Sequence, residues 1–107
     1  MSEDNPAAEA GRLTIEHDLT IYNAVETKRL LLDAVRARKT LELDLSRVGE
    51  MDTAGFQLLV LAKREAQHLD RTLRIVAHSP AVLETIEFYN MVAYFGDPVV
   101  IPAAERQ

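Results

Sequence analysis

Residues 41–56 read LELDLSRVGEMDTAGF, and this stretch decides the fold. Leucine alternates strictly with acidic residues over 41–45, which is the pattern of a β-strand with one buried face. Asp52 and Thr53 are both good helix N-caps, so a helix is predicted to begin there and to run to about Leu69. A strand that passes into a helix places functional groups in the connecting loop, at the carboxyl end of the strand.

The same reasoning, extended outward from this unit, predicts alternating strands and helices along the chain. The expected elements are strands at 13–15, 41–45 and 73–77, an extended piece at 19–22, helices at 24–38, 52–69 and 79–90, and a final edge strand at 99–101. This order, β-β-α-β-α-β-α before the edge strand, predicts an α/β fold with a mainly parallel mixed sheet and crossover helices. One domain is expected over residues 12–102, between a flexible acidic tail at 1–11 and a C-terminal tail at 103–107.

The composition excludes several classes of protein. The chain has 107 residues, 17 acidic and 12 basic side chains and no cysteine, which fits one domain without disulfides or thiolate chemistry. Thirteen acidic and eleven basic side chains lie in residues 11–102, so the packed part has no basic field for nucleic acid. An acidic start at 1–6 and the lack of about 18 consecutive apolar residues predict a cytoplasmic protein without membrane insertion.

The sequence contains no recognisable catalytic, cofactor or metal site. Its four glycines are too widely spaced for a phosphate-binding or dinucleotide-binding loop. None of the three histidines has a second histidine at metal-ligand spacing. Asp44, Glu50 and Asp52 invite comparison with a phospho-accepting receiver domain, but its acidic pair after the first strand and its later lysine are absent. We therefore expect a protein that is not an enzyme and that uses no cofactor or metal.

The loop before the second long helix carries an exposed hydroxyl. Thr53 stands at the expected helix start, where a phosphate on the hydroxyl would lie near the unpaired backbone N–H groups and the positive end of the helix dipole. The carboxylates of Glu50 and Asp52 would oppose the added charge of about −1.5 to −2. The alternative is structural, with Asp52 or Thr53 acting only as an N-cap and Gly55 allowing close packing.

These residues resemble the signature of STAS domains, the family that includes bacterial anti-sigma factor antagonists. The resemblance rests on Asp52-Thr53-Ala54-Gly55 together with the segments 43–46 and 58–59, and it extends to 19–24, 73–75 and 94–97. It implies a single STAS-type α/β domain. It also implies that the hydroxyl residue after the loop aspartate is phosphorylated by a partner that is both kinase and binding target, and only Thr53 occupies that position.

The resemblance further assigns roles to individual residues. Thr53 is the implied phosphoacceptor, Asp52 orients or polarises its hydroxyl, and residues 20–23 flank the binding surface. The implied partner-binding residues are Asp52, Thr53, Ala54, Gly55, Phe56, Thr20, Tyr22 and Asn23. The implied partners are an anti-sigma factor or serine/threonine kinase of the histidine-kinase-like ATPase type and a phosphatase that resets the switch.

Two departures from the antagonist pattern keep a second function open. The antagonists usually have serine at the acceptor and often at the next position, whereas this chain has Thr53 and Ala54. They also commonly have an aspartate near the position of Thr20. Threonine forms resemble STAS accessory subunits of chemosensory clusters or of a lipid-transport ABC complex, in which binding to an ATPase subunit needs no phosphorylation. A weak homodimer is a further alternative. Phe56 can be a core residue or part of an exposed apolar patch. The apolar run at 91–95 can be a lid over the sheet edge or a protein interface.

Overall fold

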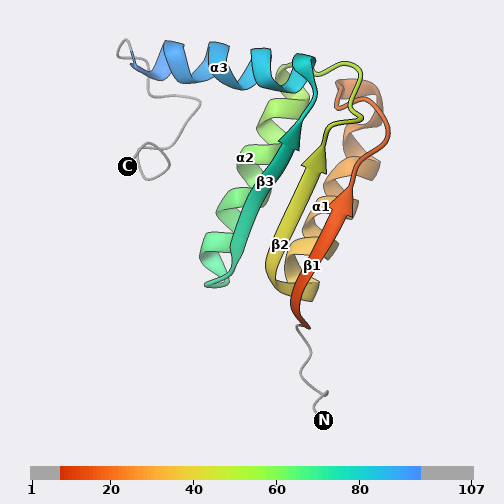
Figure 1. The fold of residues 1–107 in the computed structure, drawn as a ribbon, viewed down its shortest axis with the longest axis vertical. Coiled ribbons are helices and arrows are strands. Elements are labelled where there is room, and N and C mark those ends of the chain that lie inside the picture. The colour runs from red at the N-terminus through yellow and green to blue at the C-terminus, as the bar shows by residue number, and fades with distance from the viewer. Residues whose placement is uncertain (1–7, 95–107) are drawn as a thin grey trace.

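The computed structural model describes residues 8–94, with a parallel sheet at their centre. The strand β2 (Arg38–Leu45) lies between β1 (Ala8–Thr14) and β3 (Thr72–His78), and both neighbours run parallel to it. Figure 1 shows the three arrows pointing the same way, so the carboxyl ends of the strands meet at one edge. The predicted α/β class is confirmed, and the described part of the sheet is entirely parallel.

The two faces of the sheet differ in polarity because β2 alternates. Its three leucines, Leu41, Leu43 and Leu45, are buried on one face, while Glu42 and Asp44 are half-buried on the other. A leucine side chain buried in this way stabilises a fold by about 1.5–3 kcal/mol. On the polar face Glu42 pairs in register with Arg12, and their side chains form an ion pair at 3.4 Å.

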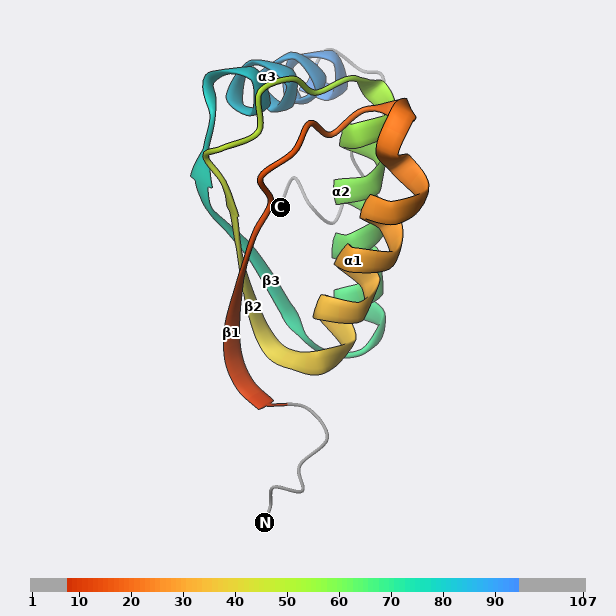
Figure 2. The same ribbon diagram turned by 90° about the vertical axis from the view of Figure 1, so that its right-hand side faces the viewer.

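Helices α1 (Ala24–Ala37) and α2 (Thr53–His68) cover the leucine face of the sheet. Figure 2 shows both helices on the same side of the strands, as two right-handed crossovers of the parallel sheet require. The buried core consists of Ile15, Leu19, Leu31, Val35, Leu41, Leu43, Leu45, Val48, Leu59, Ala62, Ala66, Leu73 and Val82. Most of these residues come from the predicted apolar positions of the central strand and the two helices.

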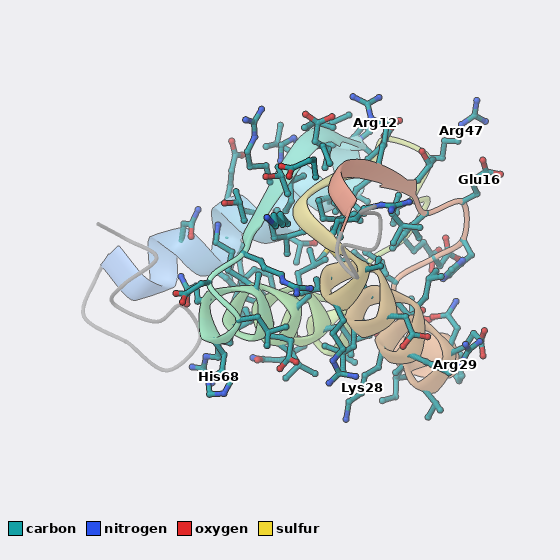
Figure 3. All side chains as sticks on the ribbon, turned by 90° about the horizontal axis from the view of Figure 1, so that it is seen from below. Arg12, Glu16, Lys28, Arg29, Arg47 and His68 are labelled. Carbon is teal, nitrogen blue, oxygen red and sulfur yellow. The ribbon has the colours of Figure 1, made fainter. Side chains whose placement is uncertain are left out.

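The outer face of α1 carries a stripe of charged side chains of alternating sign. Arg29 forms ion pairs with Glu26 and, at 3.7 Å, with Asp33, and all three side chains are well exposed. Figure 3 shows Lys28 and Arg29 pointing outward from the helix. Exposed ion pairs of this kind are worth about 0–1 kcal/mol, so the stripe serves mainly as a solvated face.

Helix α3 (Pro80–Tyr94) does not lie on the sheet face but begins beyond the carboxyl end of β3 and runs past the start of α2, as both ribbon views show (Figures 1 and 2). Its start matches the sequence prediction, because the buried Ser79 accepts the Val82 N–H with its hydroxyl oxygen at 3.2 Å. The helix continues past the predicted end near Asn90, since no helix breaker precedes Gly96. Residues 91–94 of the apolar run continue α3, whereas residue 95 and the predicted edge strand at 99–101 lie outside what the structure describes.

Two expectations near the N-terminus were wrong. Residues 19–22 form no strand: Leu19 makes only an isolated bridge with Met51, and a short 3₁₀ helix, η1 (Ile21–Asn23), follows. The turn is favoured because Asn23 Oδ1 accepts the Thr20 N–H at 3.2 Å. The strand β1 also begins at Ala8, inside the segment expected to be a tail, because backbone pairing with β2 needs no apolar alternation. The element order is therefore β1-η1-α1-β2-α2-β3-α3.

The central leucines give a first testable prediction. Leu43→Ala is expected to lower the free energy of unfolding by about 2–5 kcal/mol, because the side chain is fully buried between sheet and helices. Leu61→Ala on α2 is the matched control, since Leu61 is 37% exposed and its loss should cost far less. Chemical denaturation of both variants measures the difference, and equal losses would contradict the assignment of the core.

Candidate functional site

Thr53 is the first residue of α2 and its side chain is exposed at the carboxyl edge of the sheet. The preceding residue, Asp52, is the N-cap in extended conformation, and its Oδ1 accepts the Gly55 N–H at 2.9 Å. This cap satisfies one of the free amides of the first helical turn. The motif predicted from the sequence therefore has the local geometry of a capped helix start with an exposed hydroxyl.

Asp52 also connects this helix start to η1. Its second carboxylate oxygen, Oδ2, accepts the Ile21 N–H at 3.0 Å, and its own backbone N–H donates to the Leu19 carbonyl at 3.1 Å. Gly55 permits this approach, because a Cβ there would collide with the Leu19 backbone. The structural interpretation of the loop is confirmed, because Asp52 is a cap and Gly55 allows close packing, and the same contacts fix the backbone that carries Thr53.

These hydrogen bonds determine the charge of the site. The amides of Gly55 and then of Ile21 hold the pKa of Asp52 below its ordinary value of 3.8, so the carboxylate is ionised at neutral pH. This arrangement corrects one expectation. The backbone N–H groups of the helix start were expected to be unpaired near a phosphate on Thr53, but one of them, that of Gly55, already donates to the Asp52 carboxylate. A phosphate would therefore find the helix start partly occupied and negatively charged.

The Thr53 hydroxyl has a partner on α3. The hydroxyl oxygens of Thr53 and Tyr89 lie within hydrogen-bonding distance. The Tyr89 ring stacks on Phe56, with centroids 4.5 Å apart and an interplanar angle of 22°. The sequence did not indicate Tyr89 as a site residue, because no local pattern shows that α3 lies close to Thr53.

Some of the predicted partner-binding residues are exposed or half-buried, and others are buried. Thr53 and Tyr22 are exposed, with Tyr22 at 96%, and Asp52, Ala54, Thr20 and Asn23 are half-buried around them. Gly55 and Phe56 are buried, which settles the open question about Phe56 in favour of the core. These two residues support the site from below and offer no side-chain surface to a partner.

A second exposed group was missed by the sequence analysis. Ile21 and Val25 are 62% and 86% exposed, and with Tyr22 they form an apolar projection at η1 and the start of α1, which we call the η1 projection. A pocket beside it is lined by His17, Asp18, Thr20, Tyr22, Asn23, Glu50, Met51 and Asp52. The only signal in the sequence was Val25, an apolar residue on the polar side of a helix pattern.

The histidines have structural or solvated environments. His17 Nε2 lies 3.0 Å from the hydroxyl oxygen of Thr27, which explains how that threonine is buried on α1. His68 points away from the molecule at the end of α2 (Figure 3). Among the residues that the structure describes, no group of three or more histidine, aspartate or glutamate side chains is placed to hold a metal ion. No helix in this part of the chain is long and apolar enough to cross a membrane.

Comparison with known proteins places this fold and site in a family. The family model described as "Mlab, STAS domain" matches residues 3–96, and the chain therefore belongs to the STAS family. A solved structure with the same fold is that of the anti-sigma factor antagonist SpoIIAA in its unphosphorylated form. That structure gives a TM-score of 0.65 at 18% sequence identity over 82% of this chain and 78% of that chain. No curated protein sequence gives a significant match.

The two hydrogen bonds of Asp52 predict a pH-dependent contribution to stability. Asp52→Ala is expected to lower the free energy of unfolding by about 0.5–2 kcal/mol at neutral pH, the usual cost of losing an N-cap. Because the pKa is lowered in the folded state, this contribution is present above 3.8 and is lost as the pH falls through the lowered pKa. Urea titrations of both proteins between about pH 7 and pH 2 measure the difference.

Asp33→Ala provides the control for this prediction. Asp33 is exposed on α1 and its side chain makes only a surface ion pair with Arg29 at 3.7 Å. Its replacement should change the stability by at most about 0.5 kcal/mol. A difference between wild type and Asp52→Ala that stays constant down to about pH 2 would contradict the role assigned to the ionised carboxylate.

Proposed function

We propose that this STAS domain is a non-enzymatic signalling module that binds a protein partner and is switched by phosphorylation of Thr53. The observation that carries the proposal is the exposed hydroxyl of Thr53 on a helix start fixed by Asp52. A kinase can reach this hydroxyl without unfolding the domain. Fixed backbone around an exposed acceptor is also what a partner needs to distinguish the free from the modified form.

The modification would change the charge of the surface. Transfer of the γ-phosphoryl group of ATP breaks the bond from the γ-phosphorus to the bridging oxygen and forms a bond from phosphorus to Thr53 Oγ1. ADP leaves, and the hydroxyl proton passes to a base of the kinase. About −1.5 to −2 charges would then lie beside Asp52 and Glu50. A partner fitted to the neutral hydroxyl would be rejected by charge and by bulk.

The proposed partner is an anti-sigma factor or serine/threonine kinase of the histidine-kinase-like ATPase type, with a phosphatase that restores the free hydroxyl. The η1 projection supplies the apolar contact area beside Thr53, since exposed side chains such as Tyr22 favour protein interfaces. Cofactors, direct nucleic-acid contacts and membrane insertion have no role in this proposal. The proposed location is the cytoplasm, where the kinase finds ATP.

Intact-mass measurement tests the modification. Incubation with the cognate kinase and ATP is expected to add one phosphate to the wild type and none to Thr53→Ala. Thr85→Ala is the matched control, because the Thr85 hydroxyl donates to the Ala81 carbonyl within α3 at 2.9 Å. This variant should still gain one phosphate. An unchanged mass of the wild type with its own kinase would reject the switch.

A second candidate function is that of an accessory subunit that binds an ATPase without obligatory phosphorylation. Such subunits occur in chemosensory clusters and in lipid-transport ABC complexes. The observation that favours this function is that the Thr53 hydroxyl already has a partner in Tyr89 and that serine is absent from both 53 and 54. The matched family model, described as "Mlab, STAS domain", is consistent with it.

Affinity purification from the native host separates the two candidates. An accessory subunit should co-purify with an ATPase from cells that express either the wild type or Thr53→Ala, and capture should fall at least tenfold for Tyr22→Ala if the η1 projection forms the contact. Val76→Ala, a half-buried position on β3, provides a control away from this surface. If Thr53→Ala both lacks the phosphate and no longer co-purifies with the ATPase, the subunit function is excluded.

A further inference from the structure

The two halves of α3 are attached differently. The first turn is anchored in the core, because Val82 is fully buried and the Ser79 N–H donates to the Leu45 carbonyl at 3.1 Å. Further along, Ile86 and Tyr89 pack against a small separate cluster of Phe56 and Val60. Ile86 also packs against the main core, whereas Tyr89 belongs to the small cluster alone.

A groove limits the packing under this second half. It has a volume of about 250 Å³ and is lined by α2, β3 and α3, with Ile86 and Asn90 on the α3 side and Phe56 and Val60 on the α2 side. Surfaces that enclose such a space make fewer dispersion contacts than a filled core. The stacked Tyr89 ring and its hydroxyl are then a major part of what fixes the helix above the site.

The hydrogen bond between Thr53 and Tyr89 connects the acceptor residue directly to this helix. Phosphorylation replaces the hydroxyl hydrogen of Thr53 with a phosphoryl group and leaves Oγ1 as an ester oxygen. Oγ1 then has no proton to donate and is a weaker acceptor. The hydrogen bond between the Tyr89 hydroxyl and Thr53 Oγ1 therefore depends on whether Thr53 is phosphorylated.

The charges around Thr53 act in the same direction. The pocket on the α3 side of Thr53 is lined by Met51, Asp52, Thr53, Glu84, Thr85, Phe88 and Tyr89, so that Asp52 and Glu84 are its charged residues. Residues 80–90 of α3 contain two glutamates and no lysine or arginine. A phosphate on Thr53 would therefore face Glu84 across the pocket without a compensating cation.

We propose that α3 is the element that responds to modification of Thr53. In the free form the hydroxyl pair of Thr53 and Tyr89 holds the second half of α3 over the site. In the modified form the pair is broken, Glu84 is repelled, and the helix is released from the edge of the sheet. The inference rests on the phosphorylation proposed above, and it adds that the signal is a change in α3 as well as a change in charge.

Amide hydrogen exchange of the full chain, followed residue by residue by NMR, tests this proposal without the kinase. Tyr89→Phe keeps the ring on Phe56 but removes the hydroxyl, and it is expected to speed exchange in residues 84–90 about threefold to tenfold, the usual effect of one lost hydrogen bond. Thr53→Glu adds a negative charge and should speed the same amides at least as much. Exchange in β2 should remain unchanged in both variants.

Two variants serve as controls. Tyr22→Phe removes a hydroxyl from a side chain that is 96% exposed and lines a pocket without any residue of α3, so α3 should exchange at the wild-type rate. Thr53→Ser retains a hydroxyl and should retain most of the protection. Unchanged exchange of α3 in both Tyr89→Phe and Thr53→Glu would overturn the proposal. Equal acceleration of α3 and β2 would also overturn it, because the helix would then open only with the whole domain.

The electrostatic part has its own test. Glu84→Gln added to Thr53→Glu should restore part of the protection of α3, since it removes the carboxylate that faces residue 53. Exchange that stays as fast as in Thr53→Glu would reject repulsion by Glu84. Unchanged amide exchange in these variants would contradict the response of α3 but not the phosphorylation of Thr53. An unphosphorylated wild type in the mass measurement would contradict the phosphorylation but not the hydrogen bond between Thr53 and α3.

Discussion

The alternation of β2 is the constraint on which the rest of the structure depends. Leu41, Leu43 and Leu45 must be buried on one face, so α1 and α2 lie there, and both neighbouring strands pair with β2 in parallel. Parallel pairing brings the carboxyl ends of the three described strands to the same edge of the sheet. As a result η1, the loop before α2 and the start of α3 meet in one place, although they are far apart along the chain.

At that edge a single carboxylate serves both the fold and the site. Asp52 caps α2 through Gly55 and holds η1 through Ile21, and it does so as an anion. The exposed hydroxyl of Thr53 is therefore presented on fixed backbone beside a negative charge. Stability and the charge seen by a partner are set by the same group, so a change at Asp52 alters both.

The sequence was sufficient where structure follows from local pattern and insufficient where it follows from distant contacts. The alternation at 41–45 and the cap at Asp52 predicted their elements correctly, and the role of Thr53 stays a prediction. The segment 19–22 was misjudged because the Ile21 N–H is taken by a carboxylate 31 residues away. Tyr89 was missed for the same reason, because its hydroxyl meets a residue 36 positions earlier.

The parallel sheet also gives the molecule two ends with different uses. The strand β1 enters the sheet beside the start of β2, where Ala8 pairs with Arg38, at the end remote from Thr53 (Figure 1). A fusion partner, surface tether or fluorescent label joined ahead of Ala8 would therefore leave the opposite edge free. An attachment at the amino ends of the strands therefore leaves the edge that carries η1, the start of α2 and α3 exposed to solvent.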